Sequence, residues 1–164
     1  RDKIGFFIKT LSERDFEELF EMRELLEVFA IKQLIKNISD EEIKKFVEFD
    51  KNSREALATK SLADFASRER EFQLLIKTNA ENILLSNFIE TLNELIHREK
   101  KLFSESPEDV IISVQEHSNI IQAIKERNST KAAKAMKYHV QSVKERMRKI
   151  FDFNSNDKSI NFCN

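Results

Sequence analysis

Two histidines interrupt rows of apolar residues in segments whose spacing is typical of helices. His117 and His139 each recur with apolar neighbours every three or four residues, so each falls on the apolar face of its segment. A lone histidine in such a row is more often a satisfied core residue than a ligand. Two of them on consecutive helices could instead donate imidazole nitrogens to a divalent transition metal. Their apolar neighbours are Val110, Val114, Ile121 and Ile124 in one row, and Ala132, Met136, Val143, Met147 and Ile150 in the other.

Three more polar residues interrupt apolar rows in two further helical segments. Glu69 and Gln73 are four residues apart and therefore share one helix face. Their carboxylate and amide oxygens could join the two imidazoles around a metal. Arg23 would suit a ligand that carries a carboxylate, because the planar guanidinium binds that group through two hydrogen bonds. The structural alternative is that Arg23 pairs with Glu27 and that Glu69 is a surface charge.

The elements that must position these residues are predicted to be helices alone. The 164 residues include one Gly and one Pro, too few for the many turns of a strand-rich fold. Serines followed three residues later by an acid mark helix starts at Ser12, Ser39, Ser61 and Ser106, and Asn79 and either Ser129 or Thr130 can cap two more. We predict six helices with short, antiparallel connections. Their approximate ranges are 12–37, 40–59, 62–78, 81–102, 107–127 and 130–151.

Composition restricts the classes of function. Hydrophobic residues make up 40% and charged residues 35%, as in a water-soluble helical domain, and no apolar run approaches the roughly 18 residues of a membrane span. The single Cys163 excludes a disulfide framework and fits a reducing, cytoplasmic setting. Because 28 basic residues balance 29 acidic ones, DNA binding by this segment alone is not expected.

The order of these residues resembles a known family. The run from His117 to His139 is similar to the pattern H-x-x-I-[IL]-x-A-I-x-x-x-[DN]-x-x-x-A-x-x-x-M-x-x-H. That pattern is typical of the FCD domain, the C-terminal effector-binding domain of the FadR subfamily of GntR transcriptional regulators. Arg23-x-x-Leu26-Glu27 resembles the R-x-x-[LI]-E of the domain's first long helix, and Phe72 followed by Asn82 resembles its D-x-x-F-H segment and the next helix start. The resemblance covers residues about 11–150.

The resemblance implies a bundle of six or seven antiparallel helices around a central cavity. Many members bind a divalent metal there, such as zinc, nickel or manganese, through one Asp and three His, and small organic acids bind at or near it. Position by position, the Asp corresponds to Glu69, the first His to Gln73, and the others to His117 and His139. Glu for Asp lengthens the arm by one methylene, and Gln for His replaces a nitrogen ligand with a weak neutral oxygen.

The resemblance also implies how this segment would work in a longer protein. Residues 1–10 are expected to be the linker from an N-terminal winged-helix domain that binds operator DNA, residues 11–151 the effector domain, and residues 152–164 a flexible tail. Regulators of this type are usually homodimers. An organic acid that contacts Arg23 and the metal or its ligand shell would shift the helix arrangement and alter DNA affinity.

Three other hypotheses remain open from the sequence. Some members have lost the metal, and a metal-free domain would bind an acyl-type ligand between Arg23 and the apolar walls. A non-haem metal enzyme would also use two histidines and a carboxylate, but the sequence offers no general base beyond those ligands, so an enzyme is not expected. In a purely structural or dimerisation module, the interior polar groups would only satisfy one another.

Overall fold

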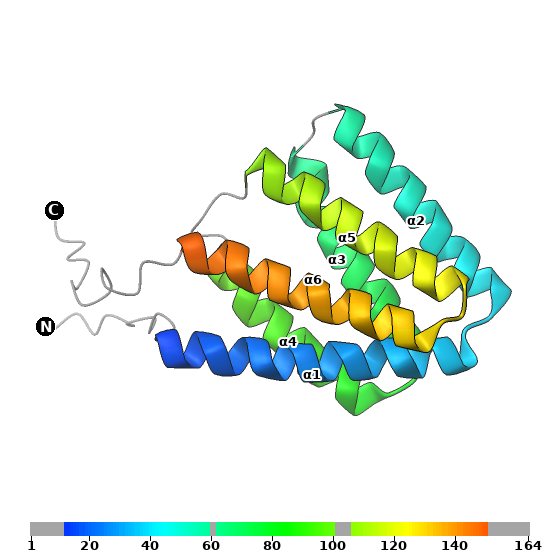
Figure 1. Cartoon of the computed structure of the whole chain (residues 1–164), viewed down its shortest axis with the longest axis horizontal. Coiled ribbons are helices and arrows are strands. Elements are labelled where there is room, and N and C mark those ends of the chain that lie inside the picture. The colour runs from blue at the N-terminus through cyan, green and yellow to red at the C-terminus, as the bar shows by residue number, and fades with distance from the viewer. Residues whose placement is uncertain (1–11, 60–61, 101–105, 151–164) are drawn as a thin grey trace, which may run out of the picture.

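The part of the chain that the structure describes folds as six α-helices, shown in the computed structural model of Figure 1. The structure describes residues 12–59, 62–100 and 106–150, except for the side chains at 58–59, 62–67, 69, 97–100 and 150, and no strand occurs in these ranges. The predicted linker 1–10 and tail 152–164 lie outside them. The all-α prediction is confirmed. The helices are α1 (Glu13–Asn37), α2 (Asp40–Thr59), α3 (Leu62–Asn79), α4 (Ile83–Lys100), α5 (Pro107–Lys125) and α6 (Ser129–Ile150).

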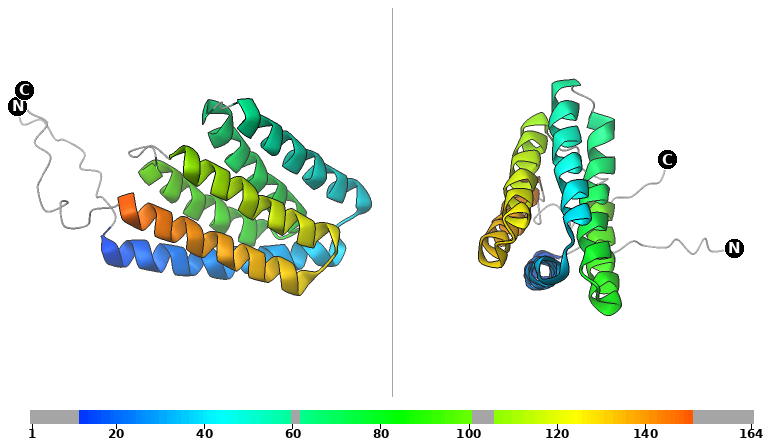
Figure 2. Two further views of the ribbon diagram at one scale, coloured as in Figure 1. Left: turned by 45° about the horizontal axis from the view of Figure 1, so that its top comes forward. Right: turned by 90° about the vertical axis from the view of Figure 1, so that its right-hand side faces the viewer.

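The helices form a layered bundle. In the right-hand view of Figure 2, α5 and α6 lie on one side and α3 and α4 on the other, with α1 and α2 between them. Accordingly, α1 packs against both α6 and α4, and α2 packs against both α5 and α3. The buried side chains at the centre include Phe16 and Phe20 of α1, Phe46 of α2 and Phe72 of α3. Burial of such aromatic side chains is the main stabilising contribution to a fold of this kind.

Local capping signals explain where most of the helices begin. Ser12 and Ser106 each form a capping box with the acid three residues on, and Ser39 exchanges hydrogen bonds with Glu42 in the same way, as predicted. Ser61 lies outside the described residues. Two predicted caps are wrong. The α4 cap is Asn82, which accepts from the Leu85 amide, and the α6 cap is Asn128, which accepts from the Lys131 amide. The asparagine amide oxygen caps as well as a serine hydroxyl.

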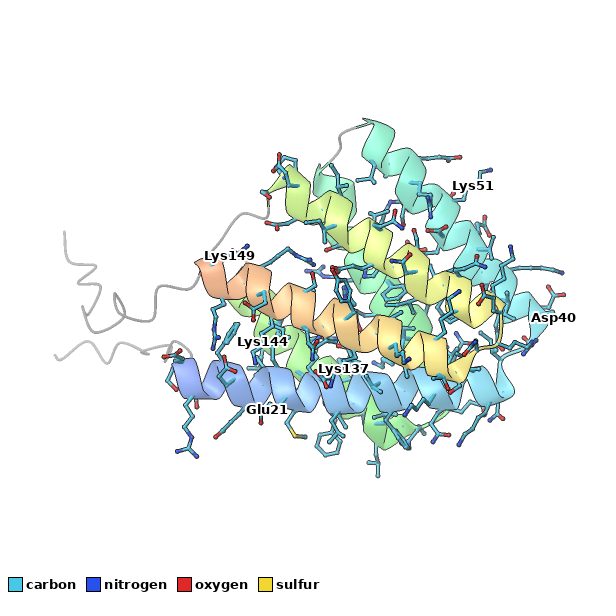
Figure 3. The ribbon with its side chains drawn as sticks, in the orientation of Figure 1. Glu21, Asp40, Lys51, Lys137, Lys144 and Lys149 are labelled. Carbon is cyan, nitrogen blue, oxygen red and sulfur yellow. The ribbon has the colours of Figure 1, made fainter. Side chains whose placement is uncertain are left out.

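One arginine joins two turns at the same end of the bundle. Arg127 ends α5 with a left-handed backbone (φ 51°), and its guanidinium donates to the Ile38 carbonyl at 2.5 Å and to Asp40 at 2.7 Å. Asp40 is labelled beside this turn in Figure 3. These contacts tie the α1–α2 turn to the α5–α6 turn, which helps to set the register of the helices that carry the two histidines.

Charged residues line the seam between α1 and α6. Lys137 lies 2.7 Å from Glu24 and Lys144 lies 2.5 Å from Glu17, measured from Nζ to a carboxylate oxygen. Figure 3 shows both lysines on α6, close to α1. Ion pairs at a partly exposed seam contribute little stability, so we assign them a role in the register of the two helices.

Within the described residues, no helix is long and apolar enough to cross a membrane.

The Ser39 cap gives a stability prediction with a defined pH dependence. We expect Ser39→Ala to lower the free energy of unfolding by about 1 kcal/mol at neutral pH, because α2 loses its cap. The backbone and side-chain hydrogen bonds from Ser39 lower the pKa of Glu42 below its ordinary 4.5. The resulting stabilisation is present above that ordinary value and is lost as the pH falls through the lowered one. Ser39→Ala removes the hydroxyl's part of this stabilisation and keeps the backbone N–H, so the cost of the substitution should shrink in acid.

Urea unfolding followed by circular dichroism, at about pH 7 and about pH 3, measures the cost of Ser39→Ala at each pH. Thr91→Ala is the control, because Thr91 is an exposed hydroxyl inside α4 that caps nothing; it should change stability by less than about 0.5 kcal/mol. An equal cost of Ser39→Ala at both pH values would contradict the proposed link to Glu42.

Candidate functional site

The structure brings His117 and His139 together in the interior. His117 of α5 is almost fully buried and His139 of α6 is fully buried, as the apolar rows predicted. The ring centres lie 4.8 Å apart, with 56° between the ring planes. The short connection from α5 to α6 places the two helices side by side and puts the two histidines at the same level of the pair.

The two nitrogens of His139 have different environments. Nδ1 lies 2.8 Å from a carboxylate oxygen of Glu116, which is itself buried on α5. Nε2 is also buried and has no hydrogen-bond partner among the residues that the structure describes. A buried polar atom without a partner is costly and is usually satisfied by a ligand, a metal or a water molecule. The ring is therefore held at Nδ1 by Glu116, while Nε2 is buried without a partner among the described residues.

Arg146 holds the Glu116 carboxylate. Its Nη1 donates to Oε1 at 3.0 Å and its Nη2 donates to Oε2 at 3.2 Å, and it also donates to Ser113 at 3.0 Å and to Ser142 at 2.6 Å. Burial acts to raise the pKa of Glu116, but hydrogen bonds from His139, Arg146 and Ser142 outweigh it and lower that pKa to about 2. Glu116 is therefore ionised at neutral pH and is purely an acceptor.

Aromatic side chains pack beside His117. Phe72 of α3 stacks on the imidazole, with ring centres 3.9 Å apart and 20° between the planes. Phe49 of α2 lies 6.4 Å from the same ring and 5.6 Å from Phe72. This wall keeps water from one side of the histidine pair, and a low local dielectric strengthens polar contacts made there.

Gln73 is buried on α3, as predicted, with 8% of its surface exposed. Its Oε1 accepts a hydrogen bond from Nδ2 of Asn93 on α4 at 3.1 Å, and its Nε2 has no partner among the described residues. Glu69 belongs to α3, but its side chain lies outside the described part of the structure. Their roles as metal ligands therefore stay predictions.

Arg23 forms a buried ion pair with Glu27, one turn away on α1. The Nε–Oε1 distance is 2.5 Å, and the two side chains are only 3% and 1% exposed. The guanidinium also lies over the Phe20 ring, 5.8 Å from its centre. This is the pairing that the structural interpretation of the sequence anticipated. The contact of Arg23 with a ligand stays a prediction.

The two imidazoles provide part of the ligand set of a divalent metal. Two imidazoles on adjacent helices are ligands that zinc and nickel favour, and a buried nitrogen of His139 has no partner among the described residues. Across the described residues, no group of three or more His, Cys, Asp and Glu side chains is placed to hold an ion. The remaining positions of a four-ligand site would have to come from Glu69, Gln73, a water molecule or the effector.

Sequence reasoning missed Glu116, Arg146 and Asn93. A signal was available for Arg146 alone, because His139, Ser142 and Arg146 follow one another at helical spacing on α6. Their contact with Ser113 and Glu116 of α5 depends on how the two helices pack. Asn93 carried no such signal, because the sequence pattern around an exposed asparagine on a helix would be the same.

A comparison with protein families identifies the chain. Residues 18–142 match the model of the FCD domain. The chain belongs to the FCD domain family. The resemblance stated from the motifs is thereby confirmed: this is an FCD domain of the type found in GntR-family transcriptional regulators. The three segments that carried the resemblance fall on α1, α3 and α5–α6, the helices that supply the polar groups of the site.

Known proteins are similar to this FCD domain in sequence and fold. It is 28% identical over 137 residues to the "Probable HTH-type transcriptional regulator LgoR" of Escherichia coli K12, covering 80% of this chain and 44% of that protein. E. coli McbR/YncC has the same fold, with a TM-score of 0.80 and 15% identity over 89% of this chain and 74% of that one. The metal-free FCD domain of TM0439 gives a TM-score of 0.71 and 20% identity over 86% and 96% of the two chains.

The chain spans about half the length of the curated relatives it matches, 44% of one and 61% of the other. Both relatives are named as HTH-type transcriptional regulators, and neither is named as an enzyme. The homologues are thus transcriptional regulators by name, in agreement with the expectation that this domain is regulatory.

Proposed function

We propose that this FCD domain senses a small organic acid, which binds at the His117–His139 pair through a divalent transition metal. The observation that carries the proposal is the environment of His139. Its ring is fully buried and held at Nδ1 by Glu116, while Nε2 lacks a partner among the described residues and lies on a ring beside His117. A structural histidine would be expected to have both nitrogens satisfied.

The metal would be held by His117 and His139, with Glu69 and Gln73 as the further predicted ligands. When bound, such an ion supplies a positive charge that attracts the carboxylate of the effector. The residues around the ion would exclude water and orient the ligating side chains. Phe72 and Phe49 exclude water beside His117, and Arg146 and Glu116 fix the orientation of His139.

Arg23 is the proposed contact to the carboxylate of the effector. Its Nε is engaged by Glu27, so the contact would use the Nη nitrogens of the guanidinium fork. Glu27 keeps one carboxylate oxygen that is buried and has no hydrogen-bond partner among the described residues. That oxygen could accept from a hydroxyl group of the effector, which favours hydroxy-carboxylates.

A metal-free domain is the second candidate, and one observation favours it. The Gln73 amide, at the position where many members have a histidine ligand, forms a hydrogen bond with Asn93 of α4. An amide oxygen already accepting a hydrogen bond is a poorer metal ligand than an uncommitted one. In this case a larger, acyl-bearing effector would occupy the interior, with Arg23 at its carboxylate and Phe49 and Phe72 along its chain.

In the intact regulator, the bound effector would alter the affinity of an N-terminal domain for operator DNA. The HTH-type names of the longer relatives support this proposal. We also propose a second copy of the chain as the partner in solution. Met22, Leu25 and Phe29 are between 45% and 63% exposed and recur along one side of α1, which gives the helix an apolar strip for such a contact.

Thermal unfolding tests the effector proposal. Zinc together with citrate or malate should raise the melting temperature more than either component alone. At a ligand concentration about 100 times Kd, binding adds about 2.7 kcal/mol to the free energy of unfolding, which corresponds to about 5–10 °C in a domain of this size. The double variant His117→Ala/His139→Ala should show no such shift.

The matched control is Gln115→Ala/Tyr138→Ala. It changes the exposed residues on the same two helices at neighbouring positions and should keep the full shift. An equal shift in the histidine variant would place the site elsewhere and contradict the proposal. A shift that citrate produces without zinc, and that the histidine variant loses, would favour the metal-free candidate.

A further inference from the structure

We infer that Glu116 is a positioning residue that fixes His139 in the tautomer with its proton on Nδ1, so that Nε2 presents a lone pair to the occupant of the site. The inference rests on the proposed function for the identity of that occupant. The tautomer itself is inferred from the geometry of α5 and α6 alone.

The first step concerns the partner of Nδ1. The Nδ1–Oε2 distance of 2.8 Å is that of a strong hydrogen bond, and both groups are buried. A carboxylate can only accept, so the hydrogen of this bond must belong to Nδ1. The contact therefore selects one of the two tautomers of a neutral imidazole.

The second step concerns the rigidity of Glu116. Both of its oxygens accept from Arg146, and the same guanidinium is held by Ser113 of α5 and Ser142 of α6. Turning the carboxylate away from His139 would break the paired hydrogen bonds with Arg146, whose side chain is only 12% exposed. Glu116 is thus locked in the orientation that keeps the Nδ1 hydrogen in place.

The third step concerns Nε2. The two ring nitrogens lie at different edges of the imidazole, and Nε2 has no hydrogen-bond partner among the described residues. If Nε2 carried a proton, a buried N–H donor would lack an acceptor, which costs more than leaving a lone pair that a cation or a ligand hydroxyl can fill. A bare lone pair repels carboxylate oxygens, so a carboxylate effector reaches His139 through a cation or through a hydroxyl donor.

Nitrogen-15 NMR of the full chain, labelled at histidine, reads the tautomer directly. We expect His139 to show a pyrrole-type Nδ1 and a pyridine-type Nε2 in the metal-free wild-type protein. This measurement needs no variant. A pyrrole-type Nε2 in the wild-type protein would overturn the inference, whether or not the protein binds a metal.

Glu116→Gln tests the cause. The amide can offer either a donor or an acceptor to Nδ1, so His139 should become a mixture of tautomers, while Glu116→Asp, which keeps the carboxylate, should restore the wild-type pattern in part. Glu126→Gln, an exposed change at the end of α5, is the control and should have no effect. An unchanged His139 spectrum in folded Glu116→Gln would overturn the inference.

Zinc titration by calorimetry gives the second readout. Loss of a carboxylate partner of a ligating histidine typically weakens metal binding about 10–100-fold, and we expect that range for Glu116→Gln. Equal zinc affinity in Glu116→Gln and the wild type would count against the positioning role. If the wild type binds no zinc but shows the expected tautomer, the metal part of the proposed function fails and the role of Glu116 is supported.

Discussion

Glu27→Gln is expected to lower the free energy of unfolding by about 3–5 kcal/mol. The substitution keeps the shape of the side chain but removes the charge that balances Arg23, and both groups are almost fully buried. An arginine left without its counter-ion in the interior carries an uncompensated desolvation cost of this size. Chemical denaturation followed by circular dichroism measures the change, which would be a large fraction of the stability of an ordinary domain.

Two companion variants separate the cost of an unpaired buried charge from the cost of losing the ion-pair contact. Arg23→Met/Glu27→Leu removes both charges and fills the space with apolar atoms, so most of the lost stability should return. Glu18→Gln breaks the exposed Arg14–Glu18 pair, which has the same four-residue spacing on α1, and should cost less than about 1 kcal/mol.

The same double variant bears on function. If Arg23 binds the carboxylate of the effector, the protein should keep its fold and lose the stabilisation that citrate gives in the presence of zinc. A cost of Glu27→Gln no larger than that of Glu18→Gln would contradict the buried ion pair.

The helical architecture could be predicted from local chemistry. The near absence of Gly and Pro excluded sheets, and the caps of α1 and α5 were predicted correctly at Ser12 and Ser106. The caps of α4 and α6 were predicted at Asn79 and at Ser129 or Thr130 instead of Asn82 and Asn128, because several polar residues near each turn can cap a helix and tertiary packing decides among them.

The two histidines could also be predicted, since their burial follows from their spacing within apolar rows. The role of Glu116 could not. It is the residue before His117, so helical periodicity alone points it away from the face that carries His117. Only the packing of α6 against α5, which brings Arg146 and His139 to that carboxylate, makes Glu116 a buried residue.

For Gln73, too, burial could be predicted from the sequence but the hydrogen-bond partner could not. Its place on the apolar row of α3 predicted its burial, and this was confirmed. Its hydrogen bond to Asn93 depends on how α3 meets α4, and no pattern within α3 contains that information. Spacing therefore predicts which residues face the interior, whereas pairing between helices decides what each one can bind.

Metal content is the other quantity for which a large change is expected. Protein without a purification tag should contain close to one equivalent of zinc, nickel or manganese when measured by inductively coupled plasma mass spectrometry. His117→Ala/His139→Ala removes both imidazoles and should contain almost none, because Glu69 and Gln73 alone are too weak a donor set for these ions. Gln115→Ala/Tyr138→Ala should retain the wild-type content.

Circular dichroism of each variant confirms that loss of metal is not loss of fold. The same content in the wild type and in the histidine variant would place the metal outside the proposed centre. The most direct test of a metal-dependent effector site is thus the metal content of the wild-type protein: close to one equivalent that vanishes in His117→Ala/His139→Ala is the result we predict, and its absence from the folded wild type after growth with added metal would contradict it.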